Sequence, residues 1–225
     1  MSVASRDRTW LVTGTMAGVT GPSAFTAAWI IASLRQPGYP VTQIQISGLA
    51  APGARDPWIM IAGFLVLGGS LIVFGLALRR RLGEARPAPL LIEVAGALTL
   101  AAGLLRRDHM LLSAGPESWH NHAHNVVSAV LYLLLIAVPL TLAWRLREEP
   151  RWRPLAGLLA VAALVSGAIL VIFVSGAAPS WDGSLQRLGV SLPLAGLIAV
   201  AWVNWHSRGS PQIGRRRPQP TSARL

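Results

Sequence analysis

The sequence predicts an all-α fold, a polytopic transmembrane bundle of six helices, and three observations support this. First, 52% of the 225 residues are hydrophobic and only 13% are charged, which is roughly half the charged fraction of an ordinary soluble domain. Second, the hydrophobic residues form uninterrupted blocks of about twenty, the length of helix that crosses a bilayer. Third, arginine is concentrated in alternate connections, which is typical of the signals that orient membrane helices.

The six predicted spans follow one another along the chain. Their approximate bounds are 10–34, 58–78, 89–105, 121–144, 155–178 and 188–206. The first is longer than the roughly 7–15-residue core of a signal peptide, so we interpret it as a retained span. Gly14 and Gly18 form a small-xxx-small pair, which we expect to pack against another helix of the same chain. Glu93 lies near the start of the third span, where we expect it to pair with an arginine of the preceding connection, Arg79, Arg80 or Arg86.

The distribution of arginine predicts the orientation of the bundle. All 20 basic residues are arginine, and 15 of them lie in the N-terminal tail, the second and fourth connections and the C-terminal tail. The other three connections contain five. Because positive charge accumulates on the cytoplasmic side, both termini are predicted to be cytoplasmic. Residues 207–225 are rich in Arg, Pro and Ser, so we expect a disordered basic cytoplasmic tail after a transmembrane domain of residues 1–206.

Composition also excludes several classes of function. The chain has no cysteine, which excludes disulfides and cysteine-based zinc sites. The net charge of +11 does not indicate a nucleic-acid partner, because the arginines lie in short connections between apolar blocks rather than in one basic patch. The spans contain almost no charge deep in the membrane, so a small-molecule transporter is the alternative that we rank lowest.

The first outer connection, residues 35–57, is long for a compact membrane protein, and such loops often have a role. Proline and glycine provide its turns. Val41, Ile44 and Ile46 are predicted to rest on the membrane surface, which would make the loop a cap over the bundle. A segment that gates access of a substrate is the alternative.

The second outer connection contains most of the histidines. If the fourth helix begins near Ser118 or Trp119, His120 and His124 lie at i and i+4 on one face, a spacing that suits a pair of metal ligands. Asp108 or His109 can supply a third ligand and leave a position open for water, as in a catalytic zinc site. The alternatives are interfacial polar histidines or a pH sensor, since imidazole titrates near pH 6.5 in water.

Arg187 is predicted to lie at the outer membrane boundary, where a charge needs a partner or contact with water. Asp108 and Asp182 are the nearest candidate partners along the predicted topology. We therefore expect a polar cluster of Asp108, His124 and Arg187 beneath the outer headgroups.

Several segments resemble a known family. They are the RQPGY segment at 35–39, the ISGLAAPG segment at 46–53, Asp108, His124, and Gly183 followed by Gln186 and Arg187. Together they are similar to a bacterial six-span membrane family catalogued as domain of unknown function 998, over residues 10–206. The resemblance implies six spans and polar positions at Tyr39, Ser47, Asp108, His124, Gln186 and Arg187. It implies no established activity.

From the sequence we expect a multi-pass protein of the bacterial cytoplasmic membrane in contact with membrane lipids. The leading hypothesis is non-catalytic binding of a lipid, a small amphiphile or a membrane protein partner through a polar pocket on the outer face, with no cofactor. The first alternative is a membrane hydrolase that uses one divalent metal such as zinc, held by His120, His124 and Asp108.

The orientation is testable with reporters fused to each end of the full-length chain. Alkaline phosphatase, which is active only outside the cytoplasm, is expected to be inactive at both ends, and green fluorescent protein is expected to be fluorescent at both. Reporters that place the two ends on opposite sides would contradict the six-span topology.

Overall fold

The computed structural model describes residues 3–82, 87–110 and 116–206, and these residues form helices and connections without a strand. Six helices are long and apolar enough to cross a membrane, which confirms the predicted all-α, six-span fold. The predicted tail, residues 207–225, lies outside the described residues. The six helices are α1 (Val3–Arg35), α2 (Pro57–Leu82), α3 (Pro87–Leu104), α4 (Trp119–Leu146), α5 (Arg153–Val174) and α6 (Asp182–His206).

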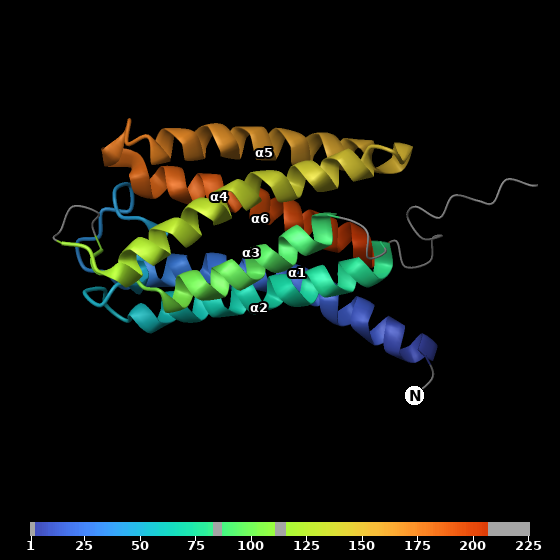
Figure 1. Cartoon of the computed structure of the whole chain (residues 1–225), viewed down its shortest axis with the longest axis horizontal. Coiled ribbons are helices and arrows are strands. Elements are labelled where there is room, and N and C mark those ends of the chain that lie inside the picture. The colour runs from blue at the N-terminus through green and yellow to red at the C-terminus, as the bar shows by residue number, and fades with distance from the viewer. Residues whose placement is uncertain (1–2, 83–86, 111–115, 207–225) are drawn as a thin grey trace, which may run out of the picture.

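The helices form a closed bundle in which each packs against the next along the chain and α1 packs against α6 (Figure 1). Helix α4 also contacts α6 across the bundle, whereas α5 lies at its edge and packs mainly on α4 and α6. Three short 3-10 helices occur in the connections: η1 (Ile46–Ala50), η2 (Pro150–Trp152) and η3 (Pro179–Trp181). Of these, η1 contacts α1, α2 and α6, so it lies within the bundle rather than beside it.

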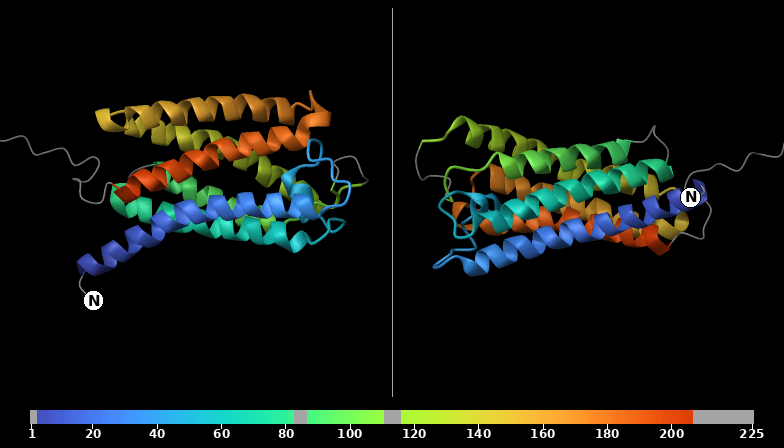
Figure 2. Two further views of the ribbon diagram at one scale, coloured as in Figure 1. Left: turned by 180° about the vertical axis from the view of Figure 1, so that it is seen from behind. Right: turned by 90° about the horizontal axis from the view of Figure 1, so that it is seen from below.

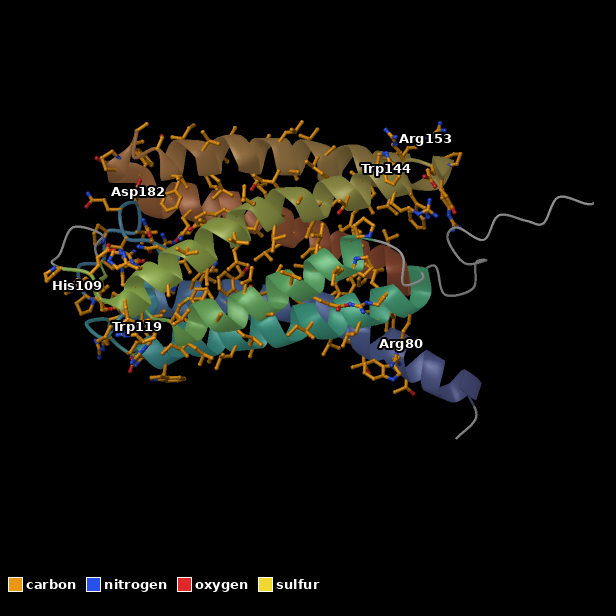
Figure 3. All side chains as sticks on the ribbon, viewed as in Figure 1. Arg80, His109, Trp119, Trp144, Arg153 and Asp182 are labelled. Carbon is orange, nitrogen blue, oxygen red and sulfur yellow. The ribbon has the colours of Figure 1, made fainter. Side chains whose placement is uncertain are left out.

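The start of α1 and the end of α6 lie at the same end of the bundle (Figure 2). We call this the terminal end. The opposite end, which we call the loop end, carries residues 36–56, the described residues between α3 and α4, and residues 175–181. Figure 3 shows Arg80, Trp144 and Arg153 at the terminal end and His109, Trp119 and Asp182 at the loop end.

Arginine and tryptophan meet at the terminal end, as expected of residues at a membrane–water interface. The guanidinium of Arg80 lies 4.2 Å from the centre of the Trp10 ring. Arg151 lies 4.8 Å from the Trp152 ring. At the same end Arg79 forms an ion pair with Glu93, which confirms the expected pairing of this intramembrane acid and reduces the cost of placing a carboxylate inside a span.

Small residues determine how closely the helices approach. A Cβ atom added to Gly14 would lie 2.0 Å from the Cβ of Ala77 on α2, and one added to Gly18 would lie 2.8 Å from the Cβ of Ala201 on α6. These contacts confirm that the pair packs within the monomer. Gly68 and Gly96 bring α2 and α3 still closer, because a Cβ on either would lie 2.7 Å from the backbone oxygen of the other.

The substitution Gly68→Ala is expected to lower stability by about 1–3 kcal/mol, because the added methyl group meets backbone atoms of α3 that cannot rotate away. The measurement is thermal unfolding of the purified protein in detergent. Gly69→Ala is the matched control, since no atom lies within 4 Å of its added Cβ and alanine favours a helix more than glycine does. Equal stability of the two variants would contradict the close α2–α3 packing.

Candidate functional site

The long connection between α1 and α2 folds into the bundle instead of resting on it. All residues from 44 to 51 are buried, with Ile44 6% and Ile46 2% exposed. The expectation that these two side chains lie on the membrane surface is therefore wrong, and only Val41, which is 43% exposed, fits it. The physical reason is that the polar backbone of this segment finds its hydrogen-bond partners on α6 and not in water.

Arg187 on α6 binds one carbonyl of this segment and two carbonyls beside it. Its Nη1 donates to the backbone oxygens of Val41, Ile44 and Gly183 at 3.0, 2.8 and 2.8 Å. Its Nη2 donates to the Tyr39 hydroxyl at 2.6 Å, and the Tyr39 hydroxyl in turn donates to the oxygen of Ile44 at 3.1 Å. A planar guanidinium with five donors suits a set of carbonyl oxygens that point to one place.

We call this arrangement the loop clasp: Arg187 and Tyr39 together with the backbone of residues 41–44. Gly183 allows it, because a Cβ there would lie 2.5 Å from the oxygens of both Val41 and Ile44. Burial raises the pKa of Tyr39 above its usual value, although the neighbouring Arg187 acts in the opposite direction. Tyr39 therefore stays a neutral hydroxyl that can both accept and donate in the clasp.

Gln186, the neighbour of Arg187, holds the next part of the same connection. Its Oε1 accepts from the backbone N–H of Ile46 at 2.6 Å, and its Nε2 donates to the Tyr132 hydroxyl on α4 at 2.8 Å. The side chain thus connects η1, α4 and α6. Both functions of the amide are used, as is required of a buried glutamine.

Asp108 belongs to a separate network that caps α4. Its carboxylate accepts from the backbone N–H of Ser118 at 2.6 Å and from the Ser118 hydroxyl at 2.8 Å. Its own backbone N–H donates to Asn121 Oδ1 at 3.1 Å. His120 lies beside the same carboxylate, with 3.3 Å between Nδ1 and Oδ1. These contacts fix the start of α4 at Trp119.

The expected cluster of Asp108, His124 and Arg187 is not formed. Among the described residues no hydrogen bond or ion pair joins any two of the three. Arg187 is bound by the backbone oxygens of Val41, Ile44 and Gly183 instead of Asp108 or Asp182, because the folded loop brings its carbonyls to the guanidinium. Ser47 and Gln186 do lie with His124 around one cavity.

His124 is buried on α4 and its orientation is determined by α3. Its Nδ1 lies 3.0 Å from the backbone oxygen of Ala102 and 2.6 Å from that of Leu105. Carbonyl oxygens only accept, so Nδ1 carries the proton and the neutral ring has its lone pair on Nε2. The side chain also closes the C-terminus of α3, whose last carbonyls have no partner within the helix.

The three residues proposed as metal ligands do not converge. His120 contacts Asp108, but His124 binds the end of α3 with its Nδ1, and no group of three His, Asp or Glu side chains in the described ranges is arranged to hold a metal. His122 instead lies 3.3 Å from Glu117. The i, i+4 spacing was correct, since α4 begins at Trp119, but the two rings are used for separate contacts.

The described part of the chain encloses a series of cavities between the helices. The interior cavity, of about 80 Å³, is lined by residues of α1, η1, α2, α3, α4 and α6: Phe25, Ile46, Ser47, Phe64, Leu67, Leu71, Ala95, Thr99, Ala102, His124, Ser128, Leu131, Tyr132, Leu135, Gln186, Val190 and Leu194. A smaller mid-bundle cavity of about 20 Å³ follows it and shares four of its residues: Leu71, Ala95, Leu135 and Leu194.

The polar groove is a wider hollow of about 360 Å³ at the loop end of α4 and α5. It is lined by Gln45, Ser47, His124, Asn125, Ser128, Ala129, Tyr132, Phe173 and Val174. Four residues line both the polar groove and the interior cavity, and we call them the throat: Ser47, His124, Ser128 and Tyr132. Three of them form a stripe at i, i+4 and i+8 along α4, which is one face of a helix.

Sequence reasoning identified Ser47, His124 and Gln186 but missed Gln45, Ser128 and Tyr132. Ser128 and Tyr132 carried a signal, since they continue the His124 face inside an apolar span. Gln45 carried none, because only the folding of residues 44–51 into the bundle brings it to the groove.

Substitution of Asp108 is expected to give a pH-dependent loss of stability. The hydrogen bond from the Ser118 backbone holds the pKa of Asp108 below its ordinary value of 3.8. A depressed folded-state pKa means that the ionised carboxylate stabilises the protein above about 3.8 and that this is lost as the pH falls through the folded pKa.

Asp108→Asn should therefore lower the Tm at pH 7, and the difference from the parent should shrink as the pH is lowered below 3.8. Glu117→Gln, which removes a more exposed carboxylate of the same connection, is the control and should change the Tm little. A difference that does not vary with pH would contradict the role of the ionised cap.

Comparison with known proteins places this site in a family. A family model described as "Protein of unknown function (DUF998)" matches residues 19–203, a range that includes the loop clasp, the throat and the α4 cap. No curated protein and no solved structure matches the chain. The match covers most of the 225 residues, so the chain belongs to this family of proteins of unknown function, and its six apolar helices make it a multi-pass membrane protein.

Proposed function

We propose that this protein binds a membrane amphiphile, with the polar head in the polar groove and the hydrocarbon chain in the interior cavity. The observation that carries the proposal is the change of lining along a series of hollows that share residues. Six of the nine residues that line the groove are polar, the interior cavity is lined by polar and apolar residues, and the residues of the mid-bundle cavity are all apolar. An amphiphile has the same order of polarity along its length.

The residues of the throat can form hydrogen bonds with a polar head group, and their arrangement does not indicate a particular reaction. Nδ1 of His124 is bound by the end of α3, so its Nε2 is the nitrogen left for a ligand donor. The hydroxyls of Ser47 and Ser128 lie at the same boundary. Small-molecule sites commonly combine a few such polar groups with an apolar wall, and the groove volume of about 360 Å³ is within the usual range for ligand sites.

Below the throat the surroundings suit a hydrocarbon chain. Phe64, Leu67 and Leu131 are among the apolar side chains of the interior cavity, and the mid-bundle cavity is lined by Leu, Ile, Val, Ala and Pro alone. An apolar cavity is poorly hydrated, so an apolar group enters it without displacing strongly bound water. The same apolar lining gives no polar path across the bundle in the described residues, which favours binding over transport.

The groove opens at the side of the bundle, where a membrane lipid is the nearest solute. Asn125 and Ala129 on α4 and Val174 on α5 all line the groove and are all exposed. Helix α5 lies at the edge of the bundle (Figure 1). An amphiphile diffusing in one leaflet therefore has access to the groove without crossing the loop end.

The proposal is tested by extracting and identifying, by mass spectrometry, the lipids that co-purify with the protein. Ala95 lines both apolar cavities, so Ala95→Leu fills them. We expect one amphiphile class to be enriched over the membrane extract with the parent protein and reduced at least about tenfold with Ala95→Leu, a loss of roughly 1.4 kcal/mol of binding.

Ala97→Leu is the matched control, because it adds the same volume to an exposed position of the same helix; enrichment should persist. If Ala95→Leu does not fold, Ser128→Leu fills the throat from α4 and should have the same effect. Absence of any enriched species, or equal enrichment with the cavity-filling variants, would refute the proposal.

A further inference from the structure

The connection between α3 and α4 places a buried cation beside the throat. Arg107 is only 3% exposed, and among the described residues it forms no ion pair. Within the described ranges its single hydrogen bond runs from Nη1 to Gln45 Oε1 at 2.8 Å, and its buried Nε has no acceptor there. Glu117 is close enough to act on its charge, but that carboxylate is turned to His122 instead.

Arg107 differs from Arg187, the other buried arginine of the loop end. Both lack an acid partner in the described ranges, and each has a buried Nε without an acceptor. In the loop clasp, however, Arg187 donates to three carbonyl oxygens and to a hydroxyl. Arg107 donates to one neutral amide. A guanidinium cannot be neutralised at ordinary pH, so Arg107 has donors and a charge that the described protein atoms do not satisfy.

A second buried donor without an acceptor in the described ranges belongs to Asn121, which is bound to the backbone of the residue that follows Arg107. Asn121 is 2% exposed, and its Oδ1 accepts from the backbone N–H of Asp108, the residue that follows Arg107. Its Nδ2 is buried and has no acceptor among the described residues. Buried donors without acceptors are rare in folded proteins, and the described residues of this region include two, Nε of the cation Arg107 and Nδ2 of Asn121. Together with the uncompensated charge they favour an oxygen-rich anion as the missing partner.

Gln45 connects this cation to the ligand site. Its side chain lines the polar groove while its Oε1 accepts from Arg107. Gln45 is thus the residue that separates Arg107 from the groove, and Nη1 of Arg107 becomes available to a ligand oxygen if the Gln45 amide moves aside. Gln45 lines the groove together with Ser47 and His124, two residues of the throat, so one side chain lies between Arg107 and the place where the head of the amphiphile is proposed to lie.

From this geometry we infer that the amphiphile carries an anionic head, a phosphate or a carboxylate, and that one of its oxygens replaces Gln45 Oε1 on Arg107. The inference rests on the proposed function and specifies the ligand class. An anionic oxygen forms a stronger, charge-assisted bond with a guanidinium than a neutral amide does. It also supplies the counter-charge that Arg107 lacks, so the exchange is favourable.

The experiment uses the full-length protein in nanodiscs of phosphatidylcholine, which has no net charge. Dodecyl phosphate, dodecanoate or dodecanol is added at the same mole fraction, and bound probe is quantified by native mass spectrometry. The two anionic probes are expected to bind at least about tenfold more tightly than the alcohol, as a hydrogen bond to a charged group would give. Inorganic phosphate without a chain is the fourth probe and should not displace dodecyl phosphate.

Four variants test which residue causes the preference for anionic probes. Arg107→Gln should abolish it, and Arg107→Lys, which keeps the charge, should retain part of it. Arg106→Gln removes the same charge from the exposed neighbouring position and is the matched control, for which the preference should persist. Gln45→Ala should preserve or strengthen binding of the anionic probes, because it removes the competing amide oxygen.

The outcomes separate the two proposals. Equal binding of the charged and uncharged probes by the parent protein would refute the anionic head while leaving amphiphile binding intact. No binding of any probe would count against both. Displacement by inorganic phosphate alone would show a free-anion site and contradict a role for the chain. Loss of the preference in Gln45→Ala would overturn the exchange, because it would make Gln45 a ligand rather than a stand-in.

Discussion

The structure depends on one constraint, which is that backbone N–H and C=O groups at membrane depth must find partners inside the protein. The six long helices meet it by themselves. The segment of residues 44–51 does not, because it enters the bundle as extended chain and a short 3-10 helix. Two of its polar groups are satisfied from α6, the oxygen of Ile44 by Arg187 and the N–H of Ile46 by Gln186. Just before the segment, the backbone N–H of Ser184 donates to the oxygen of Thr42. The loop and α6 are thus held as one unit.

This unit determines where the site lies. With η1 inserted between the helices, Ser47 reaches the throat and Gln45 reaches the polar groove. The two buried arginines of the loop end, Arg107 and Arg187, then have different roles. Arg187 stabilises the fold by binding carbonyl oxygens, whereas Arg107 is held by a single amide oxygen and is left as a positive charge beside the groove. Both arginines lack an acid partner in the described ranges, but only Arg187 has several oxygens around its guanidinium. A buried charge with so little compensation is costly to keep, which makes Arg107 the more informative of the two about function.

The packing of the helices also determines where the cavities of the site lie. Small residues bring α1, α2 and α3 into close contact, while the boundary with α4 and α6 is less tightly filled and contains the cavities. His124 crosses this boundary, since it projects from α4 and binds the last carbonyls of α3. A ligand in the throat would therefore contact a side chain that joins the two parts of the bundle, and its binding would stabilise their association.

The sequence by itself determined the six spans and the pairing of Glu93 with an arginine of the preceding connection, because hydrophobic length and the charges that flank a span are local properties of the chain. The cytoplasmic placement of both termini stays a prediction from the arginine distribution. The sequence also selected Ser47, His124 and Gln186 as polar positions. Only the tertiary structure decided their partners. Arg107 pairs with Gln45, 62 residues away, and Asp108 is separated from Arg187, because the connection between α1 and α2 is buried in the bundle. No local sequence pattern encodes this burial, because the hydrogen bonds that stabilise it come from a helix more than a hundred residues away.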